Sequence, residues 1–383
     1  MRLFLQMLLC VMLVALVSLV ASGQEPSTPR ALTSSQSASI DHLVKRQMVA
    51  LKIPGISVEL AVRGQPIYRR AFGVRAPGKA TDSGTVFPIG SITKQFTATC
   101  VMLLAEEHRV DLDSPVSKYV PRAPHGTAVT VRELLDQTSG LPDYSAQPQL
   151  QTAIGKNKLR HLLPQQLLDM IRGKALNFTP GTKFNYSNTN YVLAGMIVQA
   201  ASGESYEDFL NAHIFGPFDM RQTQYLSTSI PQGNDVSHGY EVKAGRLRPL
   251  RTFTMSWAGA AGALASSTDN LVKWDGAFFA GRVVSSHAVK VMTTPVKSDY
   301  GYGWVISTVR GDSMIWHNGG LPGAHAMNAY FPKSNLEIVI LTNLFDANPE
   351  GLAKEIYAEV EPVLESRALP VDSSSSPSSS SKV

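Results

Sequence analysis

One heptapeptide places a serine and a lysine three residues apart: Pro88-Ile89-Gly90-Ser91-Ile92-Thr93-Lys94. The apolar residues that follow, Phe96, Cys100 and Leu103, recur at helical spacing, which predicts a helix that opens at about Ser91. Positions three apart lie on one face of a helix, so the Lys94 ammonium can reach the Ser91 hydroxyl.

This pairing has a chemical interpretation. A serine is a poor nucleophile at neutral pH without a nearby base, and a lysine serves as that base when burial and positive neighbours lower its pKa. The helix N-terminus adds backbone N–H groups that can stabilise an oxyanion beside Ser91. Ser-x-x-Lys is typical of serine acyl-transfer enzymes. An isolated match is more often a helix cap followed by a surface lysine, so the interpretation depends on further motifs.

Composition excludes several classes of function. The 383 residues are 44% hydrophobic and 17% charged, which is enough to build one large domain or two lobes. The formal net charge of +5 is modest, and no basic run carries interleaved aromatics, so nucleic acid binding is not indicated. No group of His, Asp and Glu has metal-ligand spacing, and we expect neither a metal nor another cofactor.

The N-terminus has the composition of a targeting segment. Arg2 precedes an apolar run from Leu3 to Val20, and Ala21-Ser22-Gly23 offers small residues for cleavage, so residues 1–23 are predicted to be a signal peptide. We therefore expect a periplasmic or secreted protein. The alternative is an uncleaved membrane anchor, because the run is just long enough to span a bilayer. Cleavage would leave Cys100 as the single cysteine and exclude an internal disulfide.

The order of elements predicts an α+β fold. Residues 24–39 should form a flexible leader, residues 40–366 a single domain, and residues 367–383 a disordered serine-rich tail. Within the domain we expect a first helix over 40–51 and a hairpin of strands 56–62 and 66–74. The middle should be mostly helical, with helices over 159–172, 191–201 and 206–215. Late strands are expected over 303–309, 313–317, 324–331 and 336–343, followed by a closing helix over 348–364. Early and late strands would join in one antiparallel sheet with the terminal helices on one face. The helical middle would form a second lobe, with a site in the crevice between the lobes.

Two further clusters could meet Ser91 in that crevice. Tyr186-Ser187-Asn188 lies in a predicted loop, where tyrosine can move a proton and asparagine can hold a substrate amide. His317-Asn318-Gly319-Gly320 lies at the end of a predicted strand, where histidine can place a donor or a positive charge and the glycines allow close approach to a ligand. Taken alone, the first cluster is more typical of a loop that caps a helix, and the second of a hairpin turn.

In this order, the three clusters resemble the serine β-lactamase and penicillin-binding-protein superfamily. More narrowly, they resemble its class C β-lactamase-related branch, which includes DD-peptidases and esterases. The resemblance covers about Ile40 to Leu364 and implies the β-lactamase/transpeptidase-like fold. The stretches that carry it are Pro54 to Val58, Phe87 to Lys94, Leu134 to Pro142, Phe178 to Asn188, Gly262 to Ser267 and Tyr300 to Trp304.

The resemblance also implies roles. Ser91 would be the acylated nucleophile and Lys94 its activating partner, Tyr186 would shuttle a proton to and from the serine or the leaving group, and Asn188 would bind the substrate amide. The backbone N–H groups of Ser91 and Gly320 would form the oxyanion hole.

The third cluster departs from the family pattern. Many β-lactamases of this type have Lys-Thr-Gly where this chain has His317-Asn318-Gly319. Histidine at the first position resembles the DD-peptidase, D-aminopeptidase and esterase members. Losing a fixed lysine charge also weakens the expectation that a substrate carboxylate is the main anchor.

We therefore predict an exported serine hydrolase that forms a covalent acyl-enzyme on a peptide, ester or β-lactam carbonyl. A D-Ala-D-Ala-type peptidase or an esterase is favoured over a β-lactamase. Its partner would be a small molecule or peptide, for instance one derived from peptidoglycan, with no nucleic acid. The alternative is a non-catalytic protein that binds or senses β-lactams or peptidoglycan.

Overall fold

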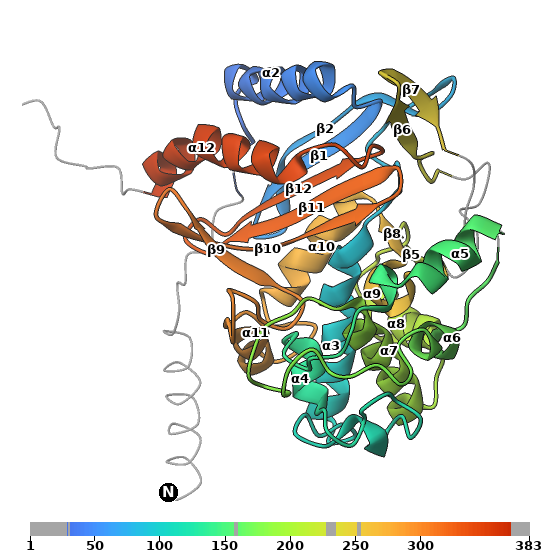
Figure 1. Cartoon of the computed structure of the whole chain (residues 1–383). Coiled ribbons are helices and arrows are strands. Elements are labelled where there is room, and N and C mark those ends of the chain that lie inside the picture. Colours follow the sequence, from blue (N-terminus) through green and yellow to red (C-terminus); the bar gives the residue numbers. More distant parts are fainter. Residues whose placement is uncertain (1–28, 30, 157–159, 227–234, 251–253, 369–383) are drawn as a thin grey trace, which may run out of the picture. The chain divides into compact units, whose positions relative to one another are not determined.

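The early and late strands of the chain form one sheet in the computed structural model (Figure 1). The structure describes residues 29, 31–156, 160–226, 235–250 and 254–368. The predicted signal peptide, residues 24–28 of the predicted leader and residues 369–383 of the predicted tail lie outside the described residues, so these assignments stay predictions.

The main sheet has seven antiparallel strands in the order β3-β2-β1-β12-β11-β10-β9. Their bounds are β1 Gly55–Val62, β2 Gln65–Ala76, β3 Lys79–Ala80, β9 Val305–Val309, β10 Asp312–Leu321, β11 Ala324–Phe331 and β12 Leu336–Thr342. The join is made by β1 and β12, with Ile56 opposite Thr342 and Val62 opposite Leu336. This confirms the predicted antiparallel sheet.

Helices α2 (Ser34–Leu51) and α12 (Pro349–Ala368) lie together on one face of the sheet (Figure 1). Side chains alternate along a strand, so Val58 and Leu60 face these helices while Ser57 and Glu59 face the other side. Helix α2 begins six residues before the predicted start at Ile40, inside the segment predicted as leader. The reason is a capping box in which Thr33 accepts from the Gln36 N–H and Gln36 accepts from the Thr33 N–H.

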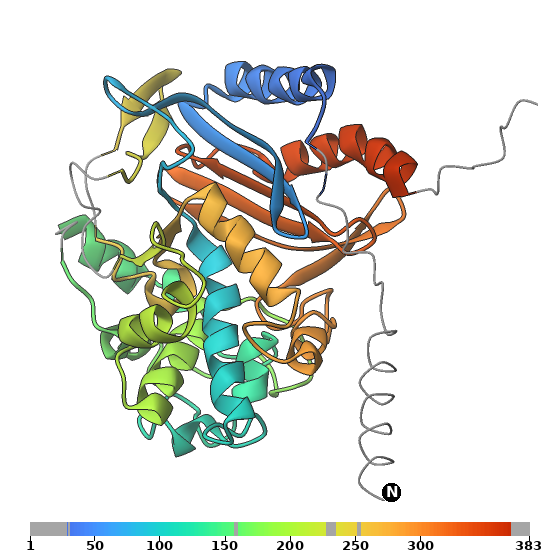
Figure 2. The ribbon, with the colours of Figure 1, turned by 180° about the vertical axis from the view of Figure 1, so that it is seen from behind.

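The other face of the sheet is covered by helices, with α10 (Thr268–Phe278) against β1 and β12 (Figure 2). Helix α3 (Thr93–Glu106) contacts α7, α8 and α9 and is buried over most of its length. The remaining helical elements are η2 Gly90–Ile92, η3 Val116–Lys118, α4 Val131–Leu135, η4 Tyr144–Ala146, α5 Pro148–Lys156, α6 Pro164–Asp169, α7 Asn188–Ser202, α8 Tyr206–Leu210, η5 Asn211–Phe215, α9 Gly259–Gly262 and α11 Ser286–Met292. The smaller strands are β4 Phe87–Pro88, β5 Gln224–Tyr225, β6 Tyr240–Lys243, β7 Arg246–Pro249 and β8 Leu264–Ser266.

The molecule is thus a mixed α+β fold with a helical middle, as predicted. One predicted helix is shorter than expected, because α6 starts at Pro164, a residue that is favoured in the first turn and holds the preceding Leu163 extended. Within the described residues, no helix combines the length and the apolar character that crossing a membrane requires.

Candidate active site

Ser91 lies on the short helix η2, between strand β4 and helix α3. The backbone enters this turn through Ile89, whose N–H donates to the Leu264 carbonyl at 2.9 Å, and through Gly90, whose φ of +51° favours glycine. Ser91 itself is half-buried, so its hydroxyl is held by a rigid turn at the edge of the core.

Lys94 is completely buried on the next turn, and its ammonium donates three hydrogen bonds. Its Nζ donates to Ser91 Oγ at 3.0 Å, to Asn188 Oδ1 at 2.9 Å and to the Ala261 carbonyl at 2.7 Å. The predicted meeting of Ser91 and Lys94 on one helical face is therefore present in the structure.

Burial lowers the pKa of Lys94 to about 7, against a smaller opposing effect of the Asp143 carboxylate. A pKa near 7 means that a large share of the lysine is neutral at physiological pH. The neutral amine has a lone pair, and Ser91 Oγ lies within hydrogen-bond distance of it. Lys94 can therefore accept the serine proton.

Tyr186 lies over the same lysine. Lys94 Nζ is 4.7 Å from the centre of the Tyr186 ring, and the ring also packs edge-on against Tyr300. Burial raises the pKa of the Tyr186 phenol well above its ordinary value, although a hydrogen bond with the Ser91 side chain acts in the opposite direction. The phenol is therefore protonated at neutral pH and suited to donate a proton rather than to remove one.

Asn188 is the first residue of α7, and all of its described polar contacts are to protein groups. Its Oδ1 accepts from Lys94, while its Nδ2 donates to Asp143 Oδ2 and to Ser145 Oγ, both at 3.1 Å. A substrate amide would compete with these bonds, so the structure places Asn188 first as a partner that orients Lys94. Its predicted role in binding substrate stays a prediction.

Asp143 and Ser145 were not among the predicted site residues. They belong to the segment after Ser139-Gly140-Leu141-Pro142, which carried the family resemblance, so a signal was present beside them. Ser145 Oγ also donates to Asp143 Oδ2 at 2.8 Å. Asp143 therefore holds the Asn188 amide both directly and through Ser145.

His317 lies within β10, in agreement with the predicted strand 313–317. Asn318, Gly319 and Gly320 continue this strand and do not form a hairpin turn, because pairing with β11 continues to Leu321. Its Nδ1–H donates to the Asn318 carbonyl at 2.6 Å, so Nε2 accepts from the Tyr300 hydroxyl at 3.2 Å. Burial, with a smaller effect of the Lys94 charge, lowers the pKa of His317 to about 3. The ring is thus neutral at physiological pH and does not supply the positive charge considered from the sequence.

The glycines of the third cluster bring β10 against η2. A Cβ built on Gly319 would lie 1.8 Å from the Ile89 carbonyl oxygen and 2.8 Å from the Ser91 nitrogen. A Cβ built on Gly90 would lie 3.0 Å from the Gly320 nitrogen. The backbone amides of Ser91 and Gly320 are therefore neighbours, as the predicted oxyanion hole requires.

A buried polar residue joins the loop after α4 to the Tyr186 loop. Gln137 has a φ of +64°, and its Oε1 accepts from the Ser187 N–H at 2.9 Å and from Asn190 Nδ2 at 2.6 Å. These bonds hold the Ser187 backbone and the Asn190 side chain, on the two sides of Asn188. Across the residues that the structure describes, no group of three or more His, Cys, Asp and Glu is arranged to hold a metal ion.

Known proteins share this architecture. The profile of the family described as Beta-lactamase matches residues 40–360. Protein flp of Staphylococcus aureus (strain MW2) is 27% identical over 344 residues, covering 86% of this chain and 67% of that protein. The octameric penicillin-binding protein homologue from Pyrococcus abyssi superposes with a TM-score of 0.75 at 29% identity, covering 85% of this chain and 77% of its own. A D-stereospecific amidohydrolase from Streptomyces sp. superposes with a TM-score of 0.74 at 27% identity, covering 84% of this chain and 98% of its own.

Proposed function

The chain belongs to the beta-lactamase family, and on that premise we propose that it is a serine hydrolase that works through a covalent acyl-enzyme on Ser91. The observation that carries the proposal is the contact between Ser91 Oγ and Lys94 Nζ at 3.0 Å, with the pKa of Lys94 lowered to about 7. This geometry gives a serine the nearby base that it needs.

Acylation would proceed as follows. The Ser91 proton passes to neutral Lys94 while Oγ bonds to the substrate carbonyl carbon, and the resulting oxyanion is held by the N–H groups of Ser91 and Gly320. The bond from that carbon to the leaving group then breaks. The leaving group takes the Tyr186 phenol proton, which Lys94 replaces.

Deacylation reverses the sequence with water. The water oxygen bonds to the acyl carbon while one water proton passes to neutral Lys94. The bond between Oγ and carbon then breaks, and Ser91 regains its proton from Lys94. The net reaction adds one water molecule across an acyl bond and returns every protein group to its starting state.

The substrate would be a peptide, amide or ester in preference to a β-lactam. His317 is neutral where a Lys-Thr-Gly motif would supply a fixed charge, so the third cluster offers no cationic anchor for a substrate carboxylate. Two of the similar structures are named a D-stereospecific amidohydrolase and a penicillin-binding protein homologue, which supports a D-amino-acid peptide or amide. A peptidoglycan-derived substrate would fit the export proposed from residues 1–23.

The second candidate is a protein that binds β-lactams or peptidoglycan without turnover. A binder needs the pocket but does not need a base for serine. The retained contact of Ser91 with a buried lysine and a protonated tyrosine therefore favours the enzyme.

The direct test is hydrolysis of 4-nitrophenyl acetate by the wild type and by Ser91→Ala. We expect the variant to lose at least about a thousandfold in kcat/KM, because no other group would form the acyl-enzyme. Ser57→Ala is the control, since Ser57 is buried on β1 and its Oγ has no hydrogen-bond partner among the described residues. Equal activity of Ser91→Ala and Ser57→Ala would overturn the proposed function.

A further inference from the structure

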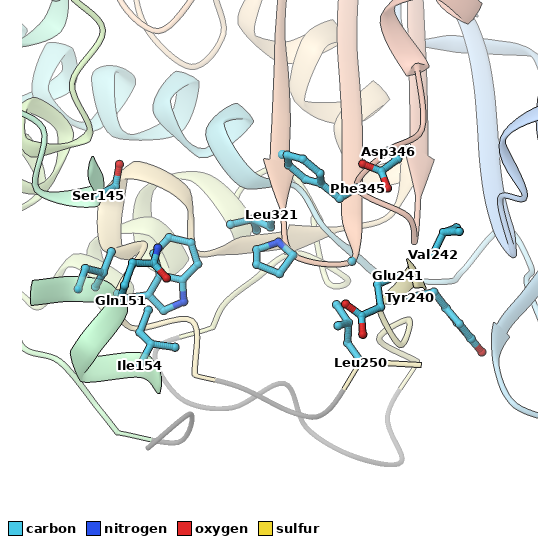
Figure 3. A pocket seen from close by; sticks show the side chains of 15 residues that line it. Ser145, Gln151, Ile154, Tyr240, Glu241, Val242, Leu250, Leu321, Phe345 and Asp346 are labelled. Carbon is cyan, nitrogen blue, oxygen red and sulfur yellow. The ribbon is translucent and has the colours of Figure 1, made fainter. Parts of the chain in front are cut away.

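A cavity of about 660 Å³ opens between Ser145, Leu250 and Phe345 (Figure 3). Ser91 itself does not line it. It reaches the catalytic groups at two points. Gly320, which neighbours the Ser91 amide, lines one side, and Ser145, which accepts from Asn188, lines the other. A substrate bound to Ser91 therefore has this cavity next to its carbonyl carbon.

The wall of the cavity is largely apolar. It is formed by Leu150, Ile154, Leu250, Trp257, Leu321 and Phe345. Phe345 is 52% exposed, and its ring edge lies 2.9 Å from a Cβ built on Gly320. An exposed aromatic ring among apolar lining residues offers contact area to an apolar group, so the cavity favours such a group.

The charged side chains on the described part of this wall have one sign. Among the described residues that line it, the charged side chains are Glu241 and Asp346, and both are exposed to solvent at the cavity. The Asp143 carboxylate lies directly behind Ser145. Arg248 stands opposite Glu241 in the β6–β7 ladder but does not line the cavity. The cavity therefore attracts a cation and repels an anion.

The position of Tyr186 decides which part of a substrate enters. The leaving group must lie beside the proton donor, and Tyr186 packs against Tyr300 and His317. These three residues do not line the cavity, whereas Gly320 does. The acyl part of the substrate would therefore occupy the cavity.

We propose that this cavity selects an apolar acyl group that ends in an ammonium group, held between the aromatic rings of Trp257 and Phe345 and the carboxylates of Glu241 and Asp346. The inference rests on the proposed function and specifies its substrate class. Aromatic faces and carboxylates both stabilise an alkylammonium ion, and an acyl group that ends in a carboxylate gains neither contact.

The test uses three 4-nitrophenyl esters of similar length, each cleaved by water to 4-nitrophenol and the free acid. The 4-(trimethylammonio)butanoyl ester carries a fixed positive charge, the 5,5-dimethylhexanoyl ester has the same shape without charge, and the glutaryl half-ester carries a carboxylate. For the wild type, we expect kcat/KM for the cationic ester to exceed that for the neutral ester by about fivefold or more, with the anionic ester lowest.

A double variant, Glu241→Gln with Asp346→Asn, tests the assignment to this cavity. We expect it to lower the ratio of cationic to neutral kcat/KM by about threefold or more, because both carboxylates are removed. The control is Glu107→Gln with Glu359→Gln, which makes the same change in net charge at exposed residues that do not line the cavity. The control should keep the wild-type ratio.

Three results would overturn the inference. Ser91-dependent hydrolysis with no cationic preference would leave the proposed function standing and remove the inference alone. A cationic preference that survives in the double variant, or falls equally in the control, would remove its assignment to this cavity. If none of the esters is cleaved in a Ser91-dependent way, the proposed function fails and the inference fails with it.

Discussion

The chemistry of the site depends on how Lys94 is held. A buried lysine with three acceptors would ordinarily stay charged, but two of those acceptors are neutral amide oxygens and the third is the serine hydroxyl. The carboxylate that influences the pKa of Lys94 belongs to Asp143, which bonds to Asn188 and not to Lys94 itself. This arrangement leaves burial as the larger effect and brings the pKa of Lys94 to about 7.

Asp143→Asn tests this balance. The Asp143 charge raises the pKa of Lys94, so its removal lowers that pKa further. Neutral Lys94 is the active form in our mechanism, and the rise of kcat/KM with pH should have its midpoint near 7 in the wild type. In the variant we expect the midpoint to move down by roughly 0.5–1 pH unit. The measurement is the pH profile of kcat/KM for 4-nitrophenyl acetate.

Asp169→Asn is the control for that profile. Asp169 is exposed at the end of α6 and pairs with Arg172 in the turn that follows the helix. Its midpoint should match the wild type. An unchanged or raised midpoint in Asp143→Asn would show that Lys94 is not the group that titrates.

For individual site residues, the sequence was most informative where the residue belongs to a motif. Spacing alone predicted the contact of Ser91 and Lys94, and the family resemblance brought Tyr186 and Asn188 to the same place. Asp143 could not be assigned a role, because it depends on a hydrogen bond between residues 45 positions apart. The neutral state of His317 also depends on its burial and on the nearby Lys94 charge, which lower the pKa of the ring and which local sequence does not reveal.

Among the elements, the contact between β10 and η2 determines the geometry around the nucleophile. Gly319 allows the strand to approach the Ile89 carbonyl and the Ser91 nitrogen more closely than any side chain permits. The approach brings the Ser91 and Gly320 amides near each other, so the proposed oxyanion site would depend on two elements and not on one residue.

Gly319→Ala should separate these elements. The new Cβ would meet backbone atoms that cannot rotate away, and we expect a loss of about 2–3 kcal/mol in the free energy of unfolding with at least a tenfold loss in kcat/KM. Urea denaturation and the ester assay measure the two effects.

Gly320→Ala is the matched comparison on the same strand. Its Cβ would meet the ring edge of Phe345, an exposed side chain that can move, so the free energy of unfolding should change by less than about 1 kcal/mol. Equal stability of the two variants would contradict the proposed close packing at Gly319.

Element boundaries were predicted where local signals dominate. The hairpin of β1 and β2 was expected from two β-rich runs around Gly64, and it forms with Val62 opposite Gln65. The start of α2 was missed because a capping threonine lies within a serine-rich segment that resembles a linker. The extent of β10 was underestimated because pairing with β11 overrides the low strand preference of Gly319 and Gly320.

For the whole molecule, the order of elements was sufficient to predict one antiparallel sheet with terminal helices on one face and a helical middle. The register of β1 with β12 could not be predicted, because it joins segments about 280 residues apart through side-chain packing on both faces. The site forms where the two halves of the fold meet: β10 from the sheet, with η2, α3 and α7 from the helical part.

The most direct measurement of the central claim is the mass of the protein during turnover. An activated phenyl ester acylates faster than it deacylates, so acyl-enzyme should accumulate when 4-nitrophenyl acetate is mixed with the protein and quenched in acid. Our account predicts one acetyl group per chain, carried by the peptide that contains Ser91 and absent from Ser91→Ala. Continued hydrolysis with the acetyl group on another residue, or with none on Ser91, would contradict it.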